Sequence, residues 1–160
     1  MSLLPTLYQH HKWANVTLID HLAGMTPEDL ARRAPGGFGT IHETLFHMVA
    51  NEARFIESFD GTTIELQPMP SDLPSCGTLR DMATRQGDKL IQLAETLTDD
   101  SQVSGTFNGQ PYTMPAFLPL FQSYHHAVEH RTNITSILAT YDLPAPNLDL
   151  WSYQDAGLPR

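Results

Sequence analysis

The chain has 160 residues, of which 41% are hydrophobic and 17% charged, and its formal net charge is −9 at neutral pH. These values are typical of a globular protein with a buried core, so we expect a single domain over residues 1–160. Nine lysines and arginines without a basic run cannot form the positive surface that nucleic acids require, and no apolar run approaches the ~18 residues of a membrane span, so we expect neither a nucleic acid nor a membrane as partner.

The N-terminal stretch predicts a long helix. Apolar residues recur at spacings of three and four over residues 3–23, which is typical of one buried helix face. Thr26 followed by Pro27 suits the start of a short helix or turn, because Thr can cap the free backbone N–H groups and Pro needs none. The first residues of the chain lack the basic start and the long apolar run of a signal peptide.

A second long helix is expected over residues 41–59. Thr40 and Glu43 form the T-x-x-E capping box, in which each side chain bonds the backbone N–H of the other residue. Residues 61–76 contain three prolines and predict a loop over the surface. A third helix is expected over residues 78–98, with Thr78 at its start.

The last third predicts a hairpin followed by a fourth helix. Asn108-Gly109 lies between two stretches that favour β-structure, which is a strong signal for a two-stranded turn. Residues 114–140 predict the helix, with Pro115 in its first turn and a kink at Pro119. The apolar residues of the proline-rich tail should pack back on the protein. We therefore expect an all-α fold, an antiparallel four-helix bundle with a small β-hairpin between the third and fourth helices.

The stretch HHAVEHR contains a candidate metal-binding pair. His126 and His130 are four residues apart, so on a helix their rings lie on one face and can bind one ion. His125 is five residues from His130 and points roughly 140° away from it, so it cannot join the pair. His42 and His47 are also five apart, and only one of them can face a common site. His47 lies among apolar residues near the middle of the second predicted helix, and is the better third ligand.

The residues alone leave several interpretations open. His126, Glu129 and His130 match the H-x-x-E-H signature of inverted zinc peptidases, but those enzymes need a downstream Glu and none follows Glu129. A di-iron bundle needs E-x-x-H, and no Glu or Asp here is followed by His three positions later. The three histidines are either ligands of a metal ion or hydrogen-bonded residues of the core.

Three stretches resemble the DinB/YfiT-like family of four-helix metal-binding proteins. They are HKWANVTLIDHL, GTIHETLFHMVANEARFI and YHHAVEHRTNITSIL, and the closing LDLWSY resembles the family's tail. The resemblance implies that His47, His126 and His130 bind one divalent ion, zinc or nickel, with a position left open for water or substrate. Position 129 varies in the family, so the H-x-x-E-H pattern is not a protease signature here.

The resemblance implies a metal-dependent enzyme with a small-molecule substrate, such as a transferase that uses a low-molecular-weight thiol. One alternative is a hydrolase that uses metal-bound hydroxide, with Glu129 as a candidate base. The other is a non-enzymatic dimeric sensor, binding or stress-response module. Asn51, one turn after His47, and Asn133, three residues after His130, are candidate substrate-binding residues or supports of the ligands.

Further expectations concern individual residues of the first and fourth predicted helices, the oligomeric state of the protein and its location. Trp13 is expected in the core and Asn15 on a helix surface, although both resemble family residues. Arg131 is expected to form an ion pair between helices or subunits. The resemblance also implies a homodimer. Cys76 is the only cysteine, which excludes an intrachain disulfide and favours the cytoplasm.

Overall fold

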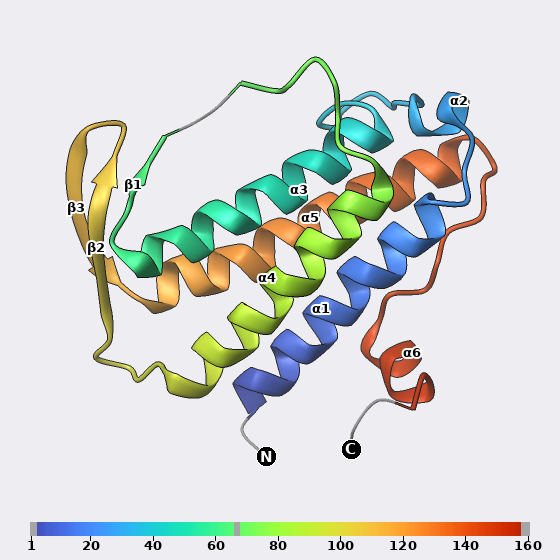
Figure 1. The fold of residues 1–160 in the computed structure, drawn as a ribbon. Coiled ribbons are helices and arrows are strands. Elements are labelled where there is room, and N and C mark those ends of the chain that lie inside the picture. The colour runs from blue at the N-terminus through green and yellow to red at the C-terminus, as the bar shows by residue number, and fades with distance from the viewer. Residues whose placement is uncertain (1–2, 66–67, 158–160) are drawn as a thin grey trace.

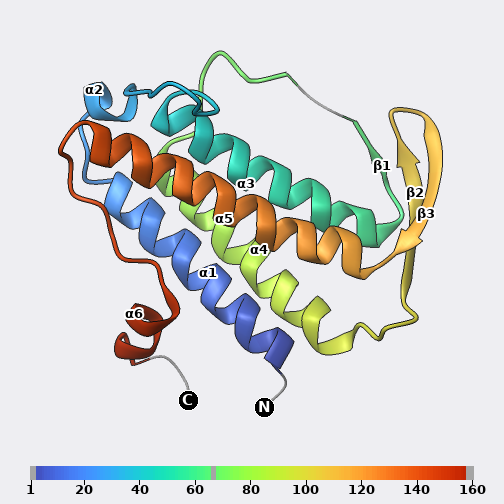
Figure 2. The same cartoon turned by 180° about the vertical axis from the view of Figure 1, so that it is seen from behind.

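The structure, a computed structural model, describes residues 3–65 and 68–157 (Figures 1 and 2). The α-helices in these ranges are α1 (Leu3–Leu22), α2 (Pro27–Leu30), α3 (Ile41–Glu57), α4 (Cys76–Thr96), α5 (Phe117–Thr140) and α6 (Leu150–Asp155). A 3-10 helix, η1, covers Ser58–Asp60. The strands are β1 (Thr63–Ile64), β2 (Gln102–Phe107) and β3 (Gln110–Pro115).

The four long helices lie side by side, with α1 packed along α4 and α3 packed along α5 (Figure 1). Their apolar faces form a shared core that includes Leu18, Ile19, Leu45, Met48, Leu79, Ala83, Ile134 and Leu138. The sequence-based prediction of a mostly helical protein is confirmed. Within the described ranges, no helix is both long and apolar enough to cross a membrane.

Local capping interactions determine where α3 and α4 begin. Thr40 and Glu43 form the complete capping box that the sequence predicts, with the Thr40 side chain accepting from the Glu43 backbone N–H. The start of α4 differs from the prediction, because Ser75 rather than Thr78 is the N-cap. The Ser75 hydroxyl accepts a hydrogen bond from the Thr78 backbone N–H at 3.2 Å, so the helix begins two residues earlier, at Cys76.

The predicted hairpin is present, but it belongs to a mixed three-stranded sheet. Asn108 and Gly109 form its turn with φ angles of 48° and 77°, the left-handed conformation that such turns require. The third strand, β1, pairs in parallel with β2, and Thr63 lies opposite Thr106. Residues 61–76 were expected to be loop throughout, and two residues of β-structure are too few to produce a visible alternation. Ile64 is buried where this strand joins the sheet.

The fourth long helix begins later than predicted. Met114 and Pro115 belong to β3, and α5 starts at Phe117. Pro119 therefore occupies the first turn of α5, where its missing N–H removes no helical hydrogen bond, and the predicted interior kink is wrong.

The tail packs back on α1, as the sequence predicts (Figure 2). His10 Nε2 lies 2.8 Å from the carbonyl oxygen of Leu148, and the ring of Tyr153 lies 5.4 Å from the rings of both His10 and Trp13. Trp13 is therefore a partly buried residue under the tail and not a member of the central core.

Candidate metal centre

Three histidines from two helices converge because α3 packs along α5. His47 lies in the middle of α3, and His126 and His130 lie one turn apart on α5. The Nε2 atom of His126 is 3.2 Å from that of His47 and 3.1 Å from that of His130. All three ligand atoms lie within 4.8 Å of one another. The structure thus brings together the residues that the sequence selects as candidate ligands.

The spacing of these nitrogens fits a divalent ion. Zn–N bonds of ~2.0–2.1 Å at tetrahedral angles separate the nitrogens by about 3.3 Å. A neutral imidazole nitrogen carries either one N–H or one lone pair, so His126 Nε2 cannot form good hydrogen bonds with both neighbours at once. A cation at the centre would accept a lone pair from each ring. The three side chains could therefore hold a metal ion.

The surroundings keep the rings neutral at physiological pH. Burial lowers the pKa of His47 to about 4, with additional repulsion from His130 and Arg54. Burial also lowers the pKa of His126 to about 4, with smaller contributions from the neighbouring histidines. The pKa of His130 is lowered by burial, although the charge of Glu129 raises it. Since a metal ligand must be unprotonated, these shifts favour metal binding.

Two phenylalanines and an asparagine surround the cluster. The ring of Phe38 stacks on His47 with a centroid distance of 3.8 Å, and Phe55 meets His126 edge-on at 5.5 Å. Asn51 Nδ2 donates to the His47 carbonyl oxygen at 2.9 Å and lies 3.0 Å from both ring nitrogens of His47, so the amide lies against the ring. Phe38 was not singled out from the sequence, because it lies in the loop before α3 rather than on a helix face.

The other candidate residues lie around this cluster and not within it. His42 Nε2 lies 2.9 Å from the carbonyl oxygen of Pro74, and His125 is exposed. Glu129 is exposed, and Asn133 donates a hydrogen bond to the Glu129 carbonyl oxygen at 3.1 Å. Among the described residues, the cluster includes no fourth His, Cys, Asp or Glu.

A buried polar network lies behind the cluster and connects α1, α3 and α5. His11 Nε2 is 2.5 Å from Glu52 Oε2, and Asn15 Nδ2 donates to the same oxygen at 3.2 Å. Arg131 donates to Asn15 Oδ1 at 2.5 Å. Burial lowers the pKa of Arg131 to about 10, whereas the carboxylate of Glu52 raises it.

The network corrects one expectation and refines another. Asn15 was expected on the surface, but it is 1% exposed, because its amide joins Arg131 of α5 to Glu52 of α3. Arg131 contacts another helix as expected, but its hydrogen bond goes to an amide oxygen and not to a carboxylate. His11 and Glu52 were not recognised from the sequence, because nothing in their spacing indicates that they meet.

Comparison with known proteins identifies the family. The model of the DinB family matches residues 1–157. The chain belongs to the DinB family. A solved structure, the crystal structure of a DinB-like protein from Bacillus cereus ATCC 10987, shares the fold of this DinB-family protein with a TM-score of 0.63. The two are 19% identical, and the match covers 88% of this chain and 91% of the other. A search of the curated proteins found no match.

Proposed function

We propose that this DinB-family protein is a metal-dependent enzyme that holds one zinc or nickel ion through His47, His126 and His130. The observation that carries the proposal is the convergence of three neutral imidazoles without a fourth protein ligand in the described part of the chain. Structural zinc sites usually have four protein ligands, whereas catalytic sites have three and an open position. A group of three histidine ligands is what a catalytic zinc site would have, and this supports the proposal.

The reaction that we propose is transfer of a low-molecular-weight thiol to or from a small-molecule substrate. A divalent ion at this site would supply acidity, since it lowers the pKa of a coordinated thiol or water. Asn51 lies against the ring of His47 and would border the bound ion. Phe38 and Phe55 would limit the access of water from two sides.

A hydrolase that activates water is the second candidate. It is favoured by Glu129, an exposed carboxylate that precedes His130 on α5 and whose charge raises the pKa of that ring. In that reaction Glu129 would accept a proton from the attacking water. Asn133 would then be a candidate for binding substrate.

We also propose that the four long helices form the antiparallel bundle of the family and that the protein is a cytoplasmic homodimer. The dimer is supported by exposed apolar side chains at the start of α5, where Phe117 and Phe121 are each about half exposed. Sedimentation at micromolar concentration tests this proposal. A species with the mass of one chain would count against it.

The proposed activity is tested with a panel of thiols and an electrophilic acceptor such as 1-chloro-2,4-dinitrobenzene. The zinc-loaded protein should consume at least one thiol faster than the stripped protein. His126→Ala should behave like the stripped protein, and His125→Ala should behave like the wild type. Thiol consumption that is the same with and without metal would contradict the transferase. Zinc-dependent hydrolysis of 4-nitrophenyl acetate without any thiol would support the hydrolase.

A further inference from the structure

A cavity of about 500 Å³ lies between α3, the sheet and the start of α5. Its apolar lining comes from Phe55, Ile64, Phe107, Met114, Leu118 and Pro119. A cavity of this volume is within the range of small-molecule sites, and a mostly apolar lining is typical of them. Strand β1 contributes Ile64 to the wall of the cavity.

The cavity adjoins the histidine cluster. Phe55, which lines it, contacts the ring of His126, and Asn51, which also lines it, contacts the ring of His47. The cavity and the histidine cluster therefore share a wall formed by Asn51 and Phe55, and none of the three histidines is among the described lining residues.

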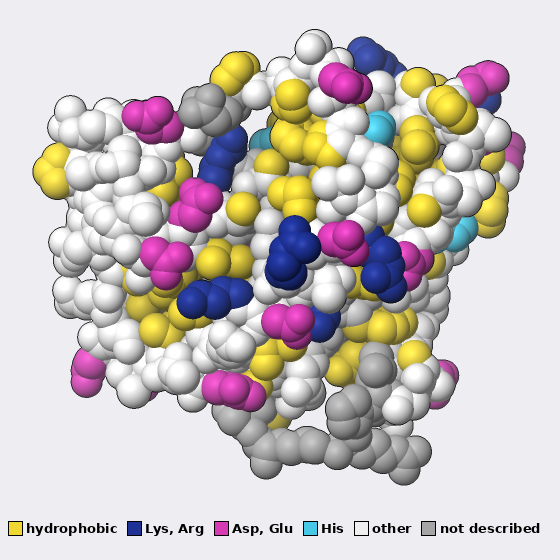
Figure 3. All heavy atoms as spheres, in the orientation of Figure 1, with side chains coloured by type: hydrophobic (Ala, Val, Ile, Leu, Met, Phe, Trp, Pro, Cys, Tyr) yellow, Lys and Arg dark blue, Asp and Glu magenta, His cyan; other side chains and the backbone are white. Residues whose placement is uncertain are grey.

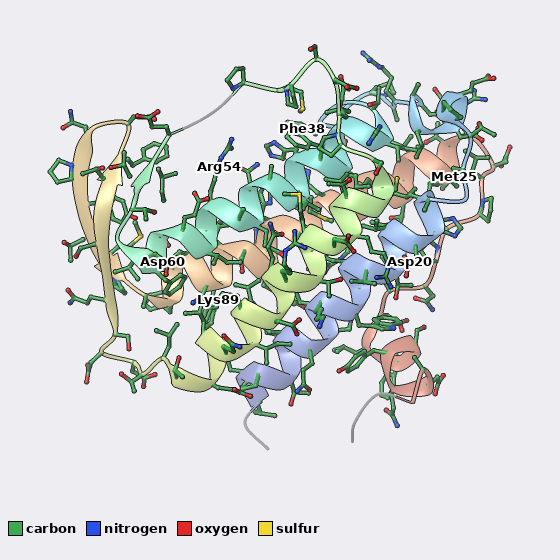
Figure 4. The ribbon with its side chains drawn as sticks, in the orientation of Figure 1. Asp20, Met25, Phe38, Arg54, Asp60 and Lys89 are labelled. Atoms are coloured by element: carbon green, nitrogen blue, oxygen red, sulfur yellow. The ribbon has the colours of Figure 1, made fainter. Side chains whose placement is uncertain are left out.

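A basic side chain lies at the end of the cavity near the histidines. The side chain of Arg54 lines it and donates from Nη1 to the Asn51 amide oxygen at 2.8 Å. Figure 4 shows Arg54 extending from α3 on the side where Phe38 also lies. In Figure 3 a basic side chain occupies the furrow between the sheet and the helices, with a histidine visible beside it.

Acidic side chains lie on the other side of Arg54. Among the described lining residues of the cavity, none is Asp or Glu. Glu57 and Glu65 border a separate groove that Arg54 also lines. The cavity thus combines an apolar body with an arginine side chain at the end next to the candidate metal centre.

We propose that the substrate bound in this cavity is a small carboxylic acid with an apolar chain or ring. Its carboxylate would lie at Arg54, since a guanidinium forms paired hydrogen bonds with a carboxylate. Its apolar body would extend toward the sheet and displace water from Phe107 and Leu118. This inference names the substrate class of the proposed enzyme and rests on that proposal.

The test is calorimetric binding of three probes, octanoate, octanamide and acetate, to the purified full chain with and without zinc. Octanoate should bind at least tenfold more tightly than octanamide, which lacks the charge, and than acetate, which lacks the apolar chain. Arg54→Gln should abolish the preference for octanoate over octanamide, and Arg54→Lys should retain most of it; zinc content is measured in both variants, because the Arg54 side chain also bonds Asn51 beside His47. Arg85→Gln removes the same charge from an exposed site on α4 and should change nothing. Leu118→Trp adds bulk at the apolar end and should weaken both eight-carbon probes.

The outcomes separate this inference from the proposed metal enzyme. Equal affinity for octanoate and octanamide would overturn the assignment of an acid. A preference that survives Arg54→Gln but disappears when zinc is removed would place the carboxylate on the ion and overturn the role of Arg54. A preference that depends on Arg54 in protein that binds no zinc would support the acid-binding cavity while contradicting the proposed metal enzyme.

Discussion

Substitution of Glu52 tests whether the buried network holds the helices together. Glu52→Ala removes the carboxylate that bonds His11 and Asn15 and that faces the buried charge of Arg131. The side chains of Glu52 and His11 are 2% and 0% exposed, so water cannot replace the lost partner. Removing one member of a buried pair typically costs about 3–5 kcal/mol. We expect the free energy of unfolding to fall by this amount, a large share of the 5–15 kcal/mol or so that is typical of a domain.

Urea unfolding of the metal-free protein at pH 7, followed by circular dichroism, measures this loss. With an m-value of about 2 kcal/mol/M, the midpoint should fall by roughly 2 M. Glu57→Ala, at an exposed position of the same helix, is the matched control and should change stability by no more than about 0.5 kcal/mol. Glu52→Gln keeps most of the side-chain volume, so it should lower the free energy of unfolding by less than Glu52→Ala does. A loss below about 1 kcal/mol for Glu52→Ala would refute the argument that burial makes this network necessary.

Two further predictions concern pH and helix packing. The pKa values of His47 and His126 are about 4 in the folded protein and ~6.5 in an unfolded chain, so both rings take up protons on unfolding at mildly acidic pH. The free energy of unfolding of the metal-free protein, measured by urea titration, should therefore be highest above pH 6.5 and should fall as the pH is lowered toward 4. The fall should be less steep in His126→Gln. If the free energy of unfolding of that variant depends on pH as steeply as in the wild type, the lowered pKa of His126 is contradicted. A Cβ on Gly87 would lie 2.5 Å from Lys12 Cγ, where α1 and α4 pack closely, so Gly87→Val should destabilise by about 1–3 kcal/mol in thermal melts. A Cβ on Gly77 of the same helix would lie no closer than 3.7 Å to another atom, so Gly77→Ala should leave the free energy of unfolding unchanged or raise it by up to about 1 kcal/mol. Equal losses of stability in both variants would exclude a steric cause at Gly87.

Features set by neighbours in the sequence could be predicted. The capping box of Thr40 and Glu43 satisfies backbone groups within one helical turn, and the turn at Asn108-Gly109 needs two adjacent residues that tolerate positive φ. The same holds for two of the three candidate ligands, because the spacing of His126 and His130 fixes their relative direction on any helix.

Features that depend on contacts between distant segments could not be predicted from residue patterns. Ile64 lies in a strand only because β2 is alongside it, and Phe38 covers His47 only because the loop before α3 folds back. The meeting of His11 with Glu52 depends on how α1 packs against α3. No local pattern in the sequence encodes these arrangements, since each requires the relative placement of segments that are distant in the sequence.

Zinc titration by calorimetry, on stripped wild type and single histidine variants, tests the central claim most directly. The wild type should bind one ion per chain. His47→Ala, His126→Ala and His130→Ala should each weaken binding at least tenfold, because two ligands hold the ion poorly. His125→Ala and His42→Ala should bind as the wild type does, since neither ring belongs to the cluster. Undiminished binding in His126→Ala, or loss of binding in His125→Ala, would contradict the assignment of the metal centre.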